Sequence, residues 1–458
     1  MRVVTTAPPP GPVPSGHCRH LGPGGGSCED GSVALGSPEE EALRLIAFLA
    51  SAPTPYHAAR LGSEQLRDAG FTEMEDKGWE DPRGAHYLIS GGTLFAFLVP
   101  PDTRPGDGLT LVAAHTDSPG LRLRPHPDLG RSGYRQLAVE VYGRPLLNSW
   151  LDRDLGLAGR AAVSTGTGVE QRLFIWAEPV ARVPQLAVHL DTGVNERGLV
   201  LNPQTQLAPV WGLGEVGRIH SRVAASLGVE GDQLLALDAM LWPLEPPVVA
   251  GADREFVSSA RLDNLLSCYC AIRALVEMGE GVTRPVVVAL FDHEEVGSVS
   301  STGAAGQAFP QLLERLTLGL GSGRAEHLQS LSRSRLLSVD VTHAANPNYP
   351  EKYEPSHLCL PNGGPAIKVN SQQRYATAAP GAGWFIAACR DQGIPVQWFS
   401  GRGDVPCGST VGPSLAAQLA VETIDLGLPV LAMHSARELG GAQDPHHLIR
   451  ALLAAAGA

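Results

Sequence analysis

The segment Val286–Gly297, which reads VVVALFDHEEVG, constrains the fold more than any other part of the chain. Six apolar residues in succession stop abruptly at Asp292, and Glu294 and Glu295 follow closely. A continuous apolar run of this length suits a strand that is covered on both faces, as the strands of parallel sheets are. In open α/β sheets, ligands bind beyond the carboxyl ends of such strands. The segment therefore predicts an α/β fold with a polar site beside the two glutamates.

Two adjacent glutamates at a buried site would repel each other and lose hydration. A nearby cation is the simplest way to keep both carboxylates ionised. On its own the pair has a second interpretation, a solvated surface turn, because glutamates are ordinarily exposed. The choice between a metal site and a surface turn depends on which other residues are expected at the same edge of the sheet.

The chain has 458 residues, more than one hydrophobic core usually accommodates, so two structural units are expected. Its net charge of −12 argues against general nucleic-acid binding. The seven cysteines contain no CxxC pair, which indicates a reduced, cytoplasmic protein and not a disulfide framework. The sequence contains no secretory signal and no apolar run that could span a bilayer, so no membrane partner is expected.

The texture of the sequence changes three times along the chain. The proline- and glycine-rich N-terminus is expected to be disordered. Ser37, Pro38 and Glu40 then provide an N-cap, a first-turn proline and a capping-box glutamate, so ordered structure is expected to start with a helix. A middle region of short alternating runs, with one helix signal at Gly214–Leu227, predicts an inserted, mostly β domain within the α/β domain. The predicted segments are a tail at 1–36, the α/β domain at 37–119 and 258–458, and the insertion at 120–257.

Two candidate histidines follow predicted strands of the α/β domain. The strand at Leu109–Ala114 leads into His115 and Asp117, whose side chains would point to one side because an extended chain alternates with period two. A carboxylate beside a histidine commonly fixes the tautomer in which the other ring nitrogen binds a metal. A histidine with ordinary hydrogen bonds is the alternative. His434 follows a second strand, at Leu428–Met433.

Two further acids stand at informative positions. Asp263 lies at the entrance of an amphipathic helix, where an ordinary N-cap is the alternative interpretation. Asp340 interrupts the apolar strand Leu336–Val341, and a buried carboxylate needs a cation or several hydrogen-bond donors. Lys368 occupies a strand-like segment, and Tyr375 follows it after a short polar stretch.

Two histidines and four carboxylates thus converge from separate elements. Imidazole mixed with carboxylate oxygen suits Zn²⁺, Mn²⁺ or Co²⁺ better than thiolate-seeking metals. The set fits a two-metal site in which one carboxylate bridges, two ligands complete each metal, and one carboxylate stays free as a general base. The six residues are His115, Asp263, Glu294, Glu295, Asp340 and His434.

Seven motifs in this order resemble the M18 family of metalloaminopeptidases, which includes aspartyl aminopeptidase, over about Pro38 to Ile449. They are HTD, ARLDN, FDHEEVGS, SVDVTHAANPNY, IKVNSQQRYAT, DVPCGSTVGP and MHSARE. The resemblance implies a phosphorylase/hydrolase-like α/β domain with a mixed sheet flanked by helices, an inserted β-rich dimerisation domain, and a pair of zinc ions in each subunit. It also implies dimers that assemble into a dodecamer of tetrahedral shape.

The resemblance also implies roles for individual residues. Asp263 would bridge the two metals, with His115 and Asp340 on one, and Glu295 and His434 on the other. Glu294 would be the general base, and Asp117 would orient His115. His189, in the insertion, would reach the active site of a neighbouring subunit and help to stabilise the tetrahedral intermediate. The remaining two positions, Lys368 and Tyr375, match residues that contact the substrate.

The resemblance leaves the preferred N-terminal residue of the peptide open. Members of the family divide between acidic residues and neutral, leucine-like residues. Lys368 could pair with a substrate carboxylate, which favours an acidic preference, but it could equally contact the protein or the intermediate. Two other functions remain as alternatives: a related di-zinc hydrolase acting on another amide, such as a carboxypeptidase or deacylase, and a non-catalytic assembly shell. A shell would be expected to lack ligands, whereas all the candidate acids and histidines are present.

Overall fold

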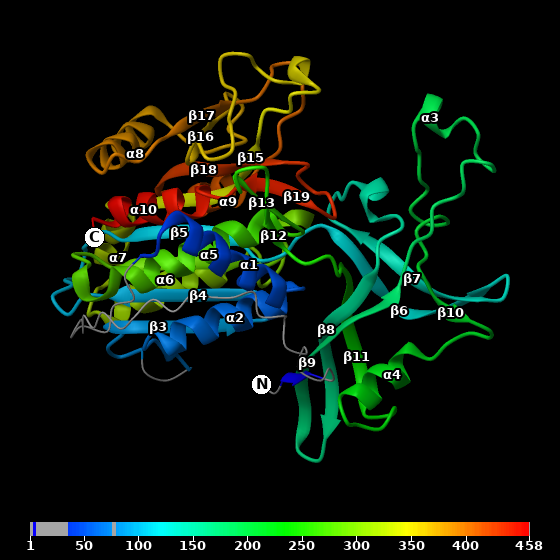
Figure 1. The fold of residues 1–458 in the computed structure, drawn as a ribbon. Coiled ribbons are helices and arrows are strands. Elements are labelled where there is room, and N and C mark those ends of the chain that lie inside the picture. The colour runs from blue at the N-terminus through cyan, green and yellow to red at the C-terminus, as the bar shows by residue number, and fades with distance from the viewer. Residues whose placement is uncertain (1–2, 6–34, 76–78, 458) are drawn as a thin grey trace, which may run out of the picture.

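A computed structural model describes residues 3–5, 35–75 and 79–457 of the chain. Two β-sheets organise these residues (Figure 1). The larger sheet, on the left of the view, is layered with helices, whereas the smaller sheet projects to the right. This arrangement of mixed sheets flanked by helices confirms the predicted α/β fold class.

The larger sheet has twelve strands, four of which form its parallel centre. In spatial order these four are β18 (Glu422–Leu431), β15 (Arg335–His343), β5 (Thr110–His115) and β14 (Val286–Phe291). Antiparallel pairs extend the sheet on both sides. The flanking strands are β2 (Thr72–Glu73), β3 (Gly84–Ser90), β4 (Thr93–Val99), β12 (Val248–Ala250), β13 (Phe256–Ser259), β16 (Ala366–Val369), β17 (Gln397–Ser400) and β19 (Glu438–Gly441).

The central strands bring distant polar residues to one edge of the sheet. Every residue of β14 is buried, as its continuous apolar sequence predicts. Its parallel register with β5 sets Phe291 opposite His115, so both strands end at the same level. The segment that carries Glu294 and Glu295 therefore follows directly beside His115.

Helices cover both faces of this sheet. One core packs helices α1 (Pro38–Ser51), α2 (Pro55–Asp68), α5 (Leu262–Met278), α8 (Ala379–Asp391) and α10 (Asp444–Ala456) against it, and the other packs α6 (Ala308–Gly319), α7 (Arg324–Ser332) and α9 (Val411–Leu419). Helix α1 begins as predicted, because the Glu40 amide donates to Ser37 Oγ and the Ser37 amide donates to the Glu40 carboxylate.

The smaller sheet has seven strands in the order β1-β9-β8-β11-β6-β7-β10 and its own hydrophobic core. Its longest connection, between β9 and β10, contains the short helix α3 (Val194–Arg197). Helix α4 (Ile219–Ser226) contributes Ile219, Val223 and Ala224 to the core. The strands are β1 (Val3–Thr5), β6 (Gly120–Arg131), β7 (Tyr134–Tyr142), β8 (Leu155–Thr165), β9 (Gly168–Ala181), β10 (Val210–Leu213) and β11 (Leu234–Pro243).

One segment limit differs from the sequence prediction. The insertion was expected to reach residue 257, but its last strand ends at Pro243, and β12 and β13 pair within the larger sheet. The expected disordered tail at 1–36 lies mostly outside the described residues. Val3–Thr5 are described, and they form β1 in parallel pairing with β9.

Helix α4 also begins later than Gly214–Leu227 suggested. Gly214 has a left-handed φ of +99°, and a Cβ atom on Gly217 would lie only 1.9 Å from the Trp211 ring. The backbone amide of Ile219 donates to the Asp128 carboxylate, 3.1 Å away, which caps the helix from a distant strand. The helix therefore starts where a carboxylate from β6 satisfies its first amide.

Neither membrane-spanning helices nor disulfides occur among the residues that the structure describes. No helix there combines the length and apolarity needed to cross a bilayer. The five cysteines in the same residues, Cys268, Cys270, Cys359, Cys389 and Cys407, are free thiols.

Candidate metal centre

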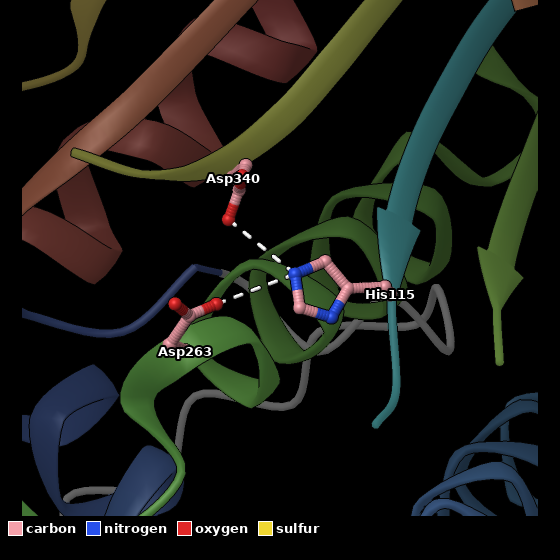
Figure 2. Close-up of side chains that lie close together, drawn as sticks. All are labelled: His115, Asp263 and Asp340. Carbon is pink, nitrogen blue, oxygen red and sulfur yellow. Dashed lines mark ion pairs between the residues drawn. The ribbon is translucent and has the colours of Figure 1, made fainter. Parts of the chain in front are cut away.

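His115, Asp263 and Asp340 meet from three separate elements, the end of β5, the entrance of α5 and the strand β15 (Figure 2). His115 Nε2 lies 3.3 Å from Asp263 Oδ1 and 3.5 Å from Asp340 Oδ1. Asp263 does not act as an N-cap. The cap position of α5 is Arg261, and the dihedral angles of Asp263 are non-helical, with its side chain turned to His115.

A second group shares Asp263 with the first. His434, just beyond β18, places Nε2 3.3 Å from Asp263 Oδ2 and 3.6 Å from Glu295 Oε2. The two oxygens of Asp263 therefore face different histidines, His115 through Oδ1 and His434 through Oδ2. This is the arrangement expected of a carboxylate that bridges two metal ions.

Asp117 fixes the segment that bears the two glutamates. Its carboxylate accepts hydrogen bonds from the backbone amides of Glu294 and Glu295, each at 3.1 Å, and from the Tyr142 hydroxyl at 2.8 Å. His115 Nδ1 lies 3.0 Å from the Asp117 carbonyl oxygen and 3.5 Å from its carboxylate. Asp117 thus holds His115 on one side and the glutamates on the other, which directs His115 Nε2 to Asp263 and Asp340.

Glu294 lies at the open side of the cluster. Its side chain is 17% exposed, and its Oε2 is 4.0 Å from His115 Nε2. Burial, supported by the charges of Asp340 and Asp263 and opposed by His115, raises the pKa of Glu294 to about 7. A carboxylate with a pKa in this range can both accept and donate a proton near neutral pH.

The residues fit a pair of zinc ions. Ligand atoms about 2.0–2.1 Å from a tetrahedral zinc lie about 3.3 Å from one another, close to the spacings between the imidazoles and carboxylates of both groups. Asp263 Oδ1 and Glu295 Oε1 are buried and have no hydrogen-bond partner among the described residues. Buried carboxylate oxygens without donors are costly unless a cation faces them.

Three residues at the centre were not singled out by the sequence. Glu438 is 2% exposed, and its carboxylate accepts hydrogen bonds from the backbone amides of Asp263, at 3.1 Å, and His434, at 2.8 Å. It therefore holds in place the two residues that face each other. Tyr142 is the last residue of β7, and Arg144 lies just after that strand. No spacing rule connects these two residues to the metal centre; for Glu438, its place in MHSARE, four residues after His434, was the available signal.

Lys368 and Tyr375 line the same cavity, of about 400 Å³, as the metal-binding candidates. Lys368 Nζ donates to the Val341 carbonyl at 2.8 Å and lies 3.5 Å from Asp340 Oδ2. It also sits 5.0 Å from the centre of the Tyr375 ring. The lysine thus contacts the protein directly, one of the possibilities that its sequence position left open.

His189 lies elsewhere. It is exposed on the long connection between β9 and β10, close to α3, which stands well away from the larger sheet in Figure 1. His189 is not among the residues that line the cavity of the same subunit. Within one chain, therefore, the structure brings together every predicted site residue except His189.

The contribution of the metal centre to the stability of the metal-free protein is expected to fall as the pH rises from about 5 to 9. Burial raises the pKa of Glu294 to about 7 and of Glu438 to about 8, and the Asp263 carboxylate outweighs burial to raise the pKa of His434 to about 9. At these three side chains the folded state keeps protons that the unfolded chain has released, so their contribution to the free energy of unfolding decreases as the pH rises. Thermal unfolding of chelator-treated and zinc-loaded protein measures this, and zinc should flatten the dependence. Parallel curves for the two forms would contradict it.

Comparison with known proteins identifies the family of the chain. Residues 48–454 match the family model described as aminopeptidase I zinc metalloprotease (M18). The probable M18 family aminopeptidase 2 of Streptomyces coelicolor is 44% identical over 417 residues, 90% of this chain and 96% of the relative. The protein of the same name from Mycobacterium leprae is 43% identical over 408 residues, 88% and 95% of the two chains.

Solved structures show the same fold. A chain in the cryo-EM structure of the Ape4 and Nbr1 complex aligns with a TM-score of 0.88 and 34% identity, covering 91% of this chain and 85% of that one. The S. cerevisiae mApe1 dodecamer aligns with a TM-score of 0.79 and 28% identity, covering 91% and 96%. The matched family model spans nearly all of the described chain, and the protein belongs to the M18 family of metalloaminopeptidases.

Proposed function

We propose that this metalloaminopeptidase uses two zinc ions per subunit to remove the N-terminal residue of peptides, with a preference for aspartate or glutamate. The observation that carries the two-ion proposal is that Asp263 is shared by two three-residue groups, one with His115 and Asp340 and one with Glu295 and His434, and turns one carboxylate oxygen toward each histidine. His115 and Asp340 would complete one ion, and Glu295 and His434 the other.

When bound, the zinc ions would supply Lewis acidity that makes water a stronger acid and polarises the peptide carbonyl. Residues of the chain would carry out the proton transfers and hold the catalytic groups in position. Glu294 would remove a proton from the attacking water and return it to the leaving amine. Asp117 holds the Glu294 backbone in place through its amide. Manganese or cobalt would suit the same oxygen and imidazole ligands.

The acidic preference is supported by the charge of the cavity wall. Lys368 and Arg144 line the cavity together with the metal-binding candidates. Once two divalent ions balance the four carboxylates of the cavity, these two cationic side chains would favour a substrate that carries a carboxylate, because charge-assisted hydrogen bonds are stronger than neutral ones. A neutral, leucine-like preference is the alternative within the family.

Hydrolysis of aspartyl, glutamyl and leucyl anilides by zinc-loaded protein tests the substrate proposal. We expect the two acidic anilides to have the higher kcat/KM, and mass spectrometry to find two zinc ions per chain. Faster leucyl turnover would refute the acidic preference alone. Release of residues from the C-terminus of longer peptides would instead point to a carboxypeptidase, and the absence of any hydrolysis by metal-loaded protein would refute the enzymatic proposal.

We further propose a cytoplasmic dodecamer built from dimers, in which His189 enters the active site of a neighbouring subunit. The connection that carries His189 exposes Leu186, Leu190 and Val200, at 57%, 74% and 87%. Several exposed apolar side chains on one connecting segment are typical of an interaction surface. A relative, S. cerevisiae mApe1, forms a dodecamer. The free cysteines named above support a reducing compartment.

Replacing His189 with alanine is therefore expected to lower kcat by about 10² to 10³-fold without changing zinc content, since one transition-state donor is lost. Mixing this variant with Glu294→Gln subunits gives a sharper measurement. Activity should partly return in mixed assemblies, because an intact Glu294 and an intact His189 can then meet across an interface. Equal activity of His189→Ala and wild type would contradict the role.

A further inference from the structure

The two cationic side chains of the cavity wall are in different states. Lys368 is 3% exposed, donates to the Val341 carbonyl and faces Asp340. Its burial and these two contacts leave at most one ammonium hydrogen for a substrate carboxylate. Arg144, by contrast, is exposed at the cavity wall, and its guanidinium has no ion pair or hydrogen bond to any residue that the structure describes.

The backbone around Arg144 is fixed although its side chain is free. The Arg144 carbonyl lies 3.0 Å from His434 Nδ1, and the Leu146 amide donates to the His434 carbonyl at 2.9 Å. A Cβ atom on Gly143, whose φ is +67°, would lie 3.2 Å from the Glu295 Cβ atom. Tyr142 is anchored to Asp117. The guanidinium is therefore attached to a rigid segment that touches both halves of the metal centre.

The charges of the cavity leave Arg144 available for a ligand. Four carboxylates line the cavity, those of Asp263, Glu294, Glu295 and Asp340. Two divalent ions would balance their charge, so the carboxylates would not need the arginine as a counter-ion. A planar guanidinium without a protein partner at the wall of a substrate cavity is suited to bidentate binding of a carboxylate.

We propose that Arg144 is a specificity-determining residue that binds a carboxylate of the peptide substrate beside the metal centre. This assignment rests on the proposed function in so far as the ligand is a peptide. The carboxylate belongs either to the side chain of the N-terminal residue or to the side chain of the residue that follows. Both sources present the same group to the guanidinium, and matched peptides separate them.

The test uses two pairs of peptides that differ only in one charge, on zinc-loaded full-length protein. Asp-Ala amide and Asn-Ala amide vary the first residue, and Ala-Asp amide and Ala-Asn amide vary the second. Arg144→Gln should raise KM for the acidic member of one pair by about tenfold to a hundredfold, and change the amide member by less than about twofold. The KM of Arg144→Lys for the acidic peptide should lie between those of wild type and Arg144→Gln, since lysine keeps the charge but lacks the planar pair of donors. Arg284→Gln, an exposed arginine at the opposite end of β14, is the matched control.

Binding gives a second measurement that does not depend on turnover. Calorimetric Kd values for the four peptides are compared for Glu294→Gln with and without Arg144→Gln, and the acidic member of the same pair should weaken by the same factor. Equal changes for acidic and amide peptides, or none, would overturn the assignment of Arg144 while leaving the aminopeptidase proposal intact. Charge-dependent binding in a wild type that hydrolyses none of the peptides would instead refute the proposed function and support the carboxylate site.

Discussion

Glu294→Gln is expected to lower kcat by about 10² to 10⁴-fold while the zinc content stays at the wild-type value. The glutamine side chain has nearly the same size and can still accept a hydrogen bond, but it cannot take up a proton. The fall should therefore appear in kcat for every peptide, acidic or neutral. Steady-state kinetics combined with metal analysis of the same preparation measures both quantities.

The metal analysis decides between two roles for Glu294. Its carboxylate also lies within reach of His115 and Glu295, so it could serve as a ligand in place of a base. Loss of zinc together with activity would support the ligand role, and full activity with full zinc would exclude both. Glu73→Gln, on an exposed edge strand of the same sheet, is the control for a change of one charge.

The second large effect is expected for Asp263→Asn. Because Asp263 faces both histidines, its replacement should weaken both ions, whereas Asp340→Asn should weaken only one. Since each bound ion supplies several kcal/mol of transition-state stabilisation, Asp263→Asn should lower kcat/KM by at least about a hundredfold.

Zinc titration after chelation measures the stoichiometry of each variant. We expect two ions in wild type, one tightly bound ion in Asp340→Asn, and none retained by Asp263→Asn through gel filtration. Unfolding curves in the presence of excess zinc control for loss of folding. Retention of two ions by Asp263→Asn would contradict the bridging role.

The sequence predicted well those parts of the fold that depend on local signals. The continuous apolar run of β14 and the capping box of α1 identify their elements because burial on both faces and helix capping act over a few residues. The ends of the central parallel strands then placed His115 and the glutamates at one edge. The family motifs supplied the rest of the candidate ligands.

The sequence failed where a contact depends on a distant element. The start of α4 is set by Asp128, whose carboxylate accepts a hydrogen bond from the amide of Ile219, more than ninety residues later in the chain. No local sequence pattern indicates that contact. The same holds for Arg144, which meets His434 across 290 residues. Lys368 shows the converse: its motif was recognised, but only the structure shows that its amine already has partners within the protein.

The segment 142–146, which starts at the last residue of β7, has a consequence for how the protein could be divided. It belongs to the chain of the smaller sheet, yet Tyr142 holds Asp117, and Arg144 and Leu146 hold His434. A truncated enzyme in which the insertion is replaced by a short linker would lose these supports even if the larger sheet folded unchanged. The smaller sheet is therefore not a detachable module for assembly alone, and the larger sheet is not by itself a minimal peptidase.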